Sequence, residues 1–271
     1  MIDFSLPDEA EALKSLAHRF AAEEIRPAAP ALDEAEEMPW DLVRRAAELG
    51  IPAYAMPEEY GGGGFTRVLA RCVVDEELYW GCAGIATVIG GTLLAATPIL
   101  IGGTEDQKRA FLPRLCQAEP PCLGAFALTE PEAGSDPSGI RTRARRDGGD
   151  YVLDGEKCFI TNGGVAGLYV VFATTDPEAG VHGLTAFVVD ADSPGVTGGK
   201  KERKMGIRAS HTAGLHFEAA RVPAANRLGA EGQGFELAMR TLDHTRAHVA
   251  AGALGIARAA FEYARDYAGE R

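Results

Sequence analysis

The stretch from residue 234 to residue 271 constrains the fold most strongly, because it contains no proline and carries a seven-residue repeat. The two rows of the repeat are Phe235, Leu242, Val249, Ile256 and Tyr263, and Met239, Arg246, Ala253, Ala260 and Tyr267. This spacing predicts one helix about 50 Å long, at ~1.5 Å per residue. Such a stripe needs partner helices to cover it, and none follows Arg271 in this sequence.

Two other zones precede this helix, and each has a different period. Residues 1–121 carry helical signals: a cap-like Ser5–Asp8, a helix between Pro39 and Gly50, and a capping box that begins at Thr104. The chain changes character near Pro120 and Pro121. We therefore expect an α+β protein with a helical domain at 1–121, a β domain at 122–228 and the first helix of a helical domain at 229–271.

The middle zone has the short apolar runs and turn dipeptides of a sheet. "LYVVFATT" at 168–175 and "LTAFVVDA" at 184–191 are strand candidates. Asp147-Gly148 and Asp154-Gly155 are turn dipeptides, so residues 141–161 are predicted to form a meander of hairpins.

Composition excludes several classes of function. The net charge of −12 argues against nucleic-acid binding and against adhesion to anionic membranes. Five cysteines without a C-x-x-C pair suggest neither a disulfide framework nor a zinc site. The sequence shows no leader and no apolar run of about 18 residues. We expect a cytoplasmic protein with no membrane span.

The strongest local signal for binding is "FALTEPEAGSD" at 126–136. Two hydroxyls, small residues and closely spaced backbone amides can surround an anion or a planar polar ring. Other candidates are weaker. The run Gly61–Gly64 lacks the Lys of a phosphate loop, and Gly232-Gln233-Gly234 is not a full dinucleotide fingerprint.

Charged residues on the long helix leave two interpretations open. His244 and His248 have a chelating spacing, but no H-E-x-x-H is present, so we expect solvated or partner-facing histidines and no metal. Arg246 is the one charged residue in the seven-residue repeat, and Asp243 lies one turn before it. The pair forms an internal salt bridge, or Arg246 faces a cleft between domains.

Several ordered motifs resemble the acyl-CoA dehydrogenase family, nearest to its medium- and short-chain branch. They are "FALTEPEAGSD", "EKCFITNGG" at 156–164, "RKMGIRASHT" at 203–212, "RVPAANRLG" at 221–229 and the segment 232–271. The resemblance covers essentially the whole chain. It implies an N-terminal helical domain, a middle β domain, a C-terminal helical bundle and FAD bound between the last two.

The resemblance also implies roles for individual residues toward FAD. The backbone at Phe126 and Leu128 meets the flavin pyrimidine, and the Thr129 hydroxyl lies near N5, where hydride arrives. Gly134 and Ser135 approach the pyrophosphate and the pantetheine arm of the substrate. The remaining FAD contacts implied are Phe159, at a position where relatives usually have Trp, Thr161, and Arg271 toward a neighbouring subunit.

On the substrate side, the resemblance implies that Leu242, Asp243, Thr245 and Arg246 line the acyl-CoA channel. Dehydrogenation to the trans-2-enoyl-CoA requires a glutamate that removes the α-proton. In a minority of relatives this glutamate precedes the matching arginine, where this sequence has Thr245. In most relatives it lies beyond the position of Arg271, so no catalytic base is assigned.

Three explanations of the missing base remain open: a fragment of a normal enzyme, a second chain that supplies the other helices, or a degenerate module. The main hypothesis is an FAD-dependent acyl-CoA dehydrogenase, and the alternative is a non-catalytic subunit that binds FAD or CoA. An electron-transfer flavoprotein is the expected electron acceptor, and a homo-oligomer, tetramer or dimer, is expected for the completed enzyme. Without the missing helices, the stripe over 235–267 should be uncovered.

Overall fold

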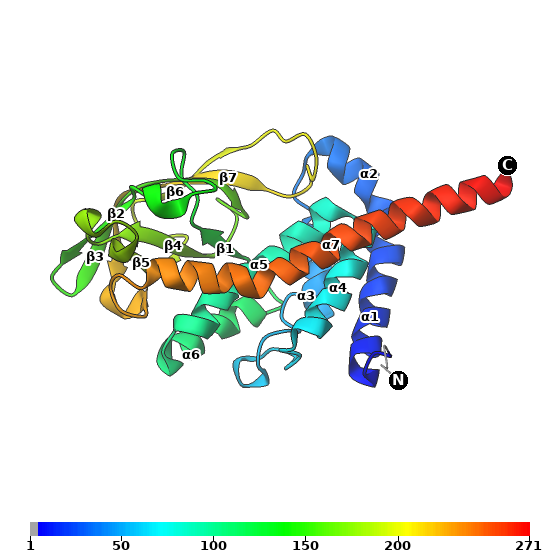
Figure 1. Cartoon of the computed structure of the whole chain (residues 1–271), viewed down its shortest axis with the longest axis horizontal. Coiled ribbons are helices and arrows are strands. Elements are labelled where there is room, and N and C mark those ends of the chain that lie inside the picture. Colours follow the sequence, from blue (N-terminus) through cyan, green and yellow to red (C-terminus); the bar gives the residue numbers. More distant parts are fainter. Residues whose placement is uncertain (1–4) are drawn as a thin grey trace.

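The computed structural model describes residues 5–271 and has helical, β and helical parts in that chain order (Figure 1). The first part contains helices α1 (Asp8–Phe20), α2 (Arg26–Ala35), α3 (Trp40–Glu48), α4 (Val68–Gly81), α5 (Ala83–Gly102) and α6 (Glu105–Cys116). The last part is the single helix α7 (Gly234–Glu270). The predicted fold class is confirmed.

Local sequence signals explain most of the helix ends. Thr104 accepts a hydrogen bond from the backbone of Gln107, and the Gln107 side chain accepts one from the backbone of Thr104, so the predicted capping box begins α6. Gly50 follows α3 with a φ of 73°, as a helix-ending glycine should. At the start of α1 the cap position is held by Pro7, and no side-chain cap hydrogen bond forms.

The middle part is a sheet of eight strands. In chain order they are β1 (Gly124–Ala127), β2 (Arg143–Asp147), β3 (Asp150–Thr161), β4 (Leu168–Thr174), β5 (Leu184–Asp190), β6 (Val196–Lys201), β7 (Thr212–Pro223) and β8 (Arg227–Leu228). Their spatial order is β6-β7-β3-β2-β4-β5-β8, with β1 paired parallel to β4. Both strand candidates and the hairpin at Asp147 are confirmed.

The hairpin turn predicted at Asp154-Gly155 is wrong. Strand β3 continues through both residues and pairs with β7, with a register shift between Leu153 and Gly155. Gly155 has a φ of 146°, and a Cβ there would lie 2.7 Å from Thr142. Gly155 therefore belongs to a β-bulge in which the backbone of β3 comes close to Thr142. Glycine is typical both of such bulges and of turns, so the local sequence does not distinguish them.

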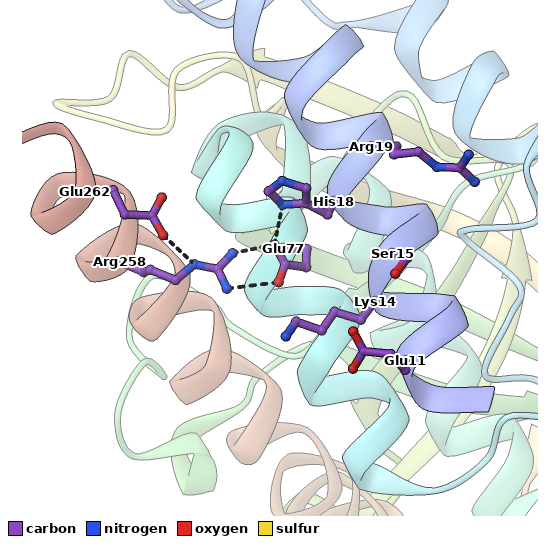
Figure 2. A pocket seen from close by; sticks show the side chains of 8 residues that line it. All are labelled: Glu11, Lys14, Ser15, His18, Arg19, Glu77, Arg258 and Glu262. Atoms are coloured by element: carbon purple, nitrogen blue, oxygen red, sulfur yellow. Dashed lines mark hydrogen bonds and ion pairs between the residues drawn. The ribbon is translucent and has the colours of Figure 1, made fainter. Parts of the chain in front are cut away.

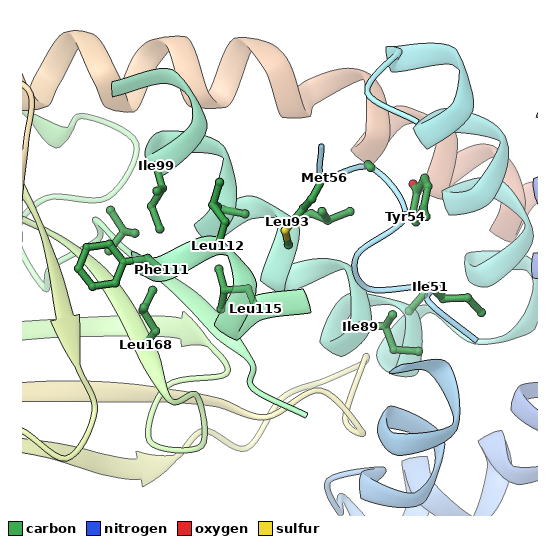
Figure 3. Packing of buried hydrophobic residues seen from close by; sticks show 14 of the residues in the cluster. Ile51, Tyr54, Met56, Ile89, Leu93, Ile99, Phe111, Leu112, Leu115 and Leu168 are labelled. Carbon is green, nitrogen blue, oxygen red and sulfur yellow. The ribbon is translucent and has the colours of Figure 1, made fainter. Parts of the chain in front are cut away.

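Helix α5 joins the helical and β parts. It packs against α4, α6, α7 and β1, and its apolar residues meet those of α6 and the sheet in one core that includes Ile99, Phe111 and Leu168 (Figure 3). By length and composition α5 could cross a membrane, so the expectation that no apolar run reaches about 18 residues is wrong. About 67% of its apolar window is buried within the protein, as in the core helix of a globular domain.

Helix α7 is one long helix, as predicted, but its packed face is not the apolar stripe. It packs mainly against α4, where Gly252 meets Tyr79 and Gly255 meets Glu76, while Gly234 at its start meets β5. Apart from Leu237, its buried residues form a seam of small or polar side chains one position before the two predicted rows: Gly234, Ala238, Thr241, Thr245, His248, Gly252 and Gly255. One residue is about 100° around a helix. The predicted stripe is consequently uncovered in part, with Val249 70% exposed and Ile256, Tyr263 and Tyr267 also exposed.

The outer half of α7 is fixed by charged side chains (Figure 2). Arg258 donates to Glu76 at 2.6 Å and forms two hydrogen bonds with Glu77, and His18 of α1 lies 2.8 Å from the same Glu77 carboxylate. Trp80 donates to Glu262 at 2.6 Å. These contacts bring α1, α4 and α7 together around a polar cavity of about 500 Å³.

The seam should tolerate no side chain at Gly255, because a Cβ there would lie 2.1 Å from the Glu76 backbone oxygen. We expect Gly255→Ala to lower the free energy of unfolding by about 1–3 kcal/mol in urea denaturation. Gly269 lies in the same helix with open space around its Cβ position. Gly269→Ala should leave the free energy of unfolding unchanged or raise it by up to about 1 kcal/mol. Equal urea midpoints for the Gly255→Ala and Gly269→Ala variants would contradict the packing described.

The Glu77 contacts should make the attachment of α7 sensitive to acid. Burial alone would raise the pKa of Glu77, but hydrogen bonds from Arg258 and His18 outweigh it and lower the pKa below its ordinary 4.5. A lowered carboxyl pKa stabilises the fold above the ordinary value, and this stabilisation is lost as the pH falls through the folded-state pKa. Hydrogen-exchange protection of residues 256–268 should therefore fall below about pH 4.5.

A matched pair of variants checks this assignment. Glu77→Gln should lower that protection at pH 7 and weaken its dependence on pH. Glu11 lies at the same cavity and has no ion pair among residues 5–271, so Glu11→Gln should behave as the parent chain does. An unchanged pH profile in Glu77→Gln would show that another group controls the attachment.

Candidate functional site

A cavity of about 250 Å³ lies where α4, α5, α7 and the end of β3 meet. Three residues expected to bind ligands line it: Thr161 from β3, and Leu242 and Thr245 from α7. Glycines open it on the α5 side, where Gly90 has nothing within 4 Å of its Cβ position. The cavity wall is mainly apolar, which suits a hydrocarbon chain.

The loop 128–136 is attached to β3 beside this cavity by a buried ion pair. Lys157 of β3 donates to the Glu130 carboxylate at 2.6 Å and to the Leu128 carbonyl at 3.1 Å. Glu130 also accepts hydrogen bonds from the backbone amides of Arg141 and Thr142. The Cys158 amide donates to the Thr129 carbonyl at 2.9 Å. The loop and the strand thus form one rigid unit.

The ion pair is charged at neutral pH. Burial lowers the pKa of Lys157 to about 8, and the Glu130 carboxylate opposes a larger shift. For Glu130, burial is outweighed by the Lys157 charge and by its hydrogen bonds, so its pKa lies below the ordinary value. Both groups are therefore ionised at pH 7, and each satisfies the other inside the protein.

Phe159 has an unusual backbone that exposes its ring. Its φ is 56°, a conformation that costs a bulky residue on the order of 1–3 kcal/mol. It lies in a second register shift of the β3–β7 pairing, between Lys157 and Ile160. The bulge leaves Phe159 65% exposed. Bulges commonly re-aim a side chain next to an active site, and this one presents an aromatic face beside the loop that holds Thr129.

These features fit a cofactor with a flat polar ring and an anionic phosphate portion, such as FAD. The hydroxyls of Thr129 and Thr161 make no hydrogen bond within residues 5–271, so both remain available as donors. Gly134 and Ser135 are exposed, and a Cβ at Gly134 would meet nothing within 4 Å. The exposed aromatic face can stack on the ring of such a cofactor, and the two free hydroxyls and open loop amides can donate hydrogen bonds to it.

The structure does not bring all of the predicted residues together. Phe126 is half-buried, with its ring 4.9 Å from that of Phe172 in the core. Asp243 and Arg246 form an exposed ion pair at 2.5 Å on α7, as one of the two interpretations predicts. Arg271 lies at the far end of α7, away from the sheet (Figure 1), with its guanidinium 5.3 Å from the Tyr267 ring.

The sequence analysis missed a polar group of residues in the cavity. Arg71 and Asp75 of α4 line it together with His248 of α7. His248 is buried against α4 with Nδ1 3.5 Å from the Asp75 carboxylate, so the expectation of a solvated or partner-facing His248 is wrong. His244 is exposed. Within residues 5–271 no cluster of His, Cys, Asp or Glu could hold a metal, and the five cysteines are free.

The Glu130–Lys157 pair should dominate the stability of the loop. Lys157→Met leaves the Glu130 charge buried with backbone donors only, so we expect a loss of about 3–5 kcal/mol in the free energy of unfolding. The exposed pair Arg240–Glu236, at 3.8 Å, is the control, and Arg240→Ala should cost less than about 1 kcal/mol. Similar urea midpoints for the two variants would contradict the role given to Lys157.

Comparison with known sequence families gives three matches in chain order. The acyl-CoA dehydrogenase N-terminal domain matches residues 7–119, the middle domain matches 125–220, and the C-terminal domain matches 232–271. The matched segments correspond to helices α1–α6, to the sheet and to α7, respectively.

Individual proteins agree with these matches. The acyl-CoA dehydrogenase of Bacillus subtilis (strain 168) is 43% identical over 260 residues, which are 96% of this chain and 68% of that protein. Butyryl-CoA dehydrogenase from Megasphaera elsdenii superposes with a TM-score of 0.95 at 44% identity, covering 100% of this chain and 71% of the other.

An acyl-CoA dehydrogenase from Bacillus anthracis, solved as a complex with FAD, superposes with a TM-score of 0.90 at 34% identity. This likeness covers 100% of the chain and 47% of the other protein. Fold, order of domains and sequence identity all lead to one conclusion: the chain belongs to the acyl-CoA dehydrogenase family.

Proposed function

We propose that this chain is part of an FAD-dependent acyl-CoA dehydrogenase that converts an acyl-CoA thioester to its trans-2-enoyl-CoA. The observation that carries the proposal is the junction at Thr161, where the flavin-fitting surface of β3 meets the mainly apolar cavity between α4, α5 and α7. The FAD complex of the Bacillus anthracis relative supports the choice of cofactor.

On the flavin side, the residues act by position and hydrogen bonding. Bound FAD would supply the hydride acceptor of the reaction. Phe159 offers a face for the ring, and the hydroxyls of Thr129 and Thr161 donate to it. The backbone at Phe126 and Leu128 borders its edge, Gly134 and Ser135 face the phosphates, and Arg271 reaches the FAD of a neighbouring subunit. Lys157 and Glu130 hold this surface in place.

On the substrate side, the cavity receives the acyl chain. Leu242 and Thr245 lie in its wall, and Asp243 and Arg246 stand on the outer face of α7 for the CoA portion. Removal of the α-proton needs a positioned base. Thr245 does not provide one, because its hydroxyl donates to the Thr241 carbonyl at 3.1 Å. We assign no base among residues 5–271.

The remaining expectations belong to the same proposal. Electrons leave to an electron-transfer flavoprotein, and the enzyme acts in the cytoplasm as a homo-oligomer. Its domains divide at residues 1–121, 122–228 and 229–271. The uncovered apolar residues of α7, such as Val249 and Ile256, support contact with further helices.

A non-catalytic FAD- or CoA-binding subunit is the alternative, and the hydroxyl at Thr245 favours it. Loading the chain with FAD and adding short acyl-CoA thioesters without oxygen, with and without helices that carry a glutamate base, separates the two functions. The proposed enzyme bleaches its flavin and releases a 2-enoyl-CoA only when the base is supplied, because none is assigned among residues 5–271. Binding of both ligands without bleaching in the completed protein supports the alternative, and a chain that takes up no FAD contradicts both.

Cofactor binding itself should depend on the exposed ring at the bulge. We expect Phe159→Ala to weaken FAD binding about three- to tenfold in calorimetric titration, because stacking of aromatic rings contributes ~0.5–1.5 kcal/mol beyond burial. Met205 is fully exposed in another loop, so Met205→Ala serves as the control with unchanged affinity. Equal affinities for both variants would show that the flavin does not contact Phe159.

A further inference from the structure

The cavity has a polar end that the reaction chemistry does not use. Arg71 and Asp75 lie one turn apart on α4, and His248 faces them from α7. We call these three residues the polar end. The rest of the wall is mainly apolar and includes Leu94 and Leu242. A cavity for a plain alkyl chain gains nothing from three ionisable side chains, which are costly to bury.

Two buried atoms of the polar end, Nε2 of His248 and Nε of Arg71, lack hydrogen-bond partners within residues 5–271. Asp75 is 8% exposed, and its one close polar contact is His248 Nδ1 at 3.5 Å. His248 is 6% exposed, and its Nε2 atom is buried without a partner. The half-buried Arg71 side chain has a hydrogen bond with Tyr54, but its Nε is buried and unpaired. Buried polar groups in proteins are normally paired, so Nε2 of His248 and Nε of Arg71 are available to a ligand.

The available donors and acceptors define the chemistry of that ligand. His248 has a hydrogen bond with the His244 backbone, and its Nδ1 faces the Asp75 carboxyl, so we assign the ring proton to Nδ1 and a lone pair to Nε2. Arg71 offers donors only. Burial raises the pKa of Asp75 to about 7, so near neutral pH its carboxyl both accepts and donates. The matching ligand group must also donate and accept.

We propose that the cavity binds an acyl group that carries a hydroxyl at its distal end, held by Arg71, Asp75 and His248. This inference rests on the proposed function. A methyl end would leave Nε2 of His248 and Nε of Arg71 unpaired. An ammonium end would be repelled by Arg71, and a carboxylate end would add a second negative charge beside Asp75 while leaving Nε2 of His248 without a donor.

Matched acyl-CoA thioesters test the proposal. Compounds of equal heavy-atom number that end in methyl, hydroxyl or carboxylate are titrated calorimetrically, over several lengths, into the FAD-loaded chain. At the length that reaches Asp75, the hydroxyl compound should bind about tenfold more tightly than its methyl match, because it pairs buried polar groups. The carboxylate compound should bind no more tightly than the methyl compound. Methyl compounds that bind as tightly as hydroxyl compounds at every length would overturn the proposal.

Variants of Asp75 identify the cause of the preference. Asp75→Ala should abolish the preference for hydroxyl, and its persistence there would overturn the proposal. Asp75→Asn keeps the shape and the hydrogen bonds, so it should retain the hydroxyl preference and bind the carboxylate compound more tightly than the parent does. This second variant decides the question if Asp75→Ala does not fold. Glu76, which bonds Arg258 away from the cavity, is the control, and Glu76→Gln should match the parent.

The outcomes also separate this inference from the proposed function. A chain that binds no acyl-CoA thioester of any kind contradicts both. A chain that binds methyl and hydroxyl thioesters equally well retains the proposed function and loses the hydroxyl subsite.

Discussion

The ion pair between Glu130 and Lys157 is the contact on which the candidate site depends. It joins a loop with little regular structure of its own to the middle of β3, and two backbone amides complete the coordination of the carboxylate. A buried pair of this kind is weak evidence for net stability, because desolvation offsets much of the Coulomb attraction. Its value here is geometric: it fixes Thr129 relative to Phe159 and Thr161.

A second constraint acts on the opposite wall of the cavity. Helix α7 approaches α4 closely because its packed seam contains glycine, alanine and threonine, and Gly252 lies against the Tyr79 ring. The same approach brings His248 onto α4 and places Thr245 at the cavity. The distance between these two helices therefore sets the width of the space available to an acyl chain.

Local sequence patterns were sufficient to predict the order of helices and strands, but they did not predict contacts between residues that are distant in sequence. The capping box at Thr104, the strands β4 and β5, and the length of α7 follow from signals within a few residues. The dipeptide Asp154-Gly155 led to a wrong prediction of a turn, because glycine is typical of β-bulges as well as of turns. On α7, the seven-residue repeat indicated that the more apolar stripe is packed, whereas the packed face is the adjacent seam of small residues.

The lack of information on contacts between distant residues also explains which residues of the candidate site were predicted and which were not. Motif resemblance identified Thr129, Phe159 and Thr161, and the structure places the segments that carry them side by side; their roles toward FAD stay predictions. Glu130 and Lys157 lay inside the quoted motifs, yet their pairing spans 27 positions in sequence. Asp75 and His248 are even farther apart in sequence. They lie on two different helices, so no local periodicity could indicate that they are neighbours. Isolated charges within otherwise apolar helical stretches were the signal that could have indicated them.

Strand β3 carries one further consequence. Phe159 and Thr161 are two residues apart on the same strand, one turned outward by the bulge and the other set in the cavity wall. In the proposed enzyme, the spacing between cofactor and acyl chain is therefore built into a single piece of hydrogen-bonded backbone. Substitutions in α4, α5 and α7 can reshape the space for the acyl group while the reacting partners keep their separation, so this architecture lets substrate choice diverge independently of the redox chemistry.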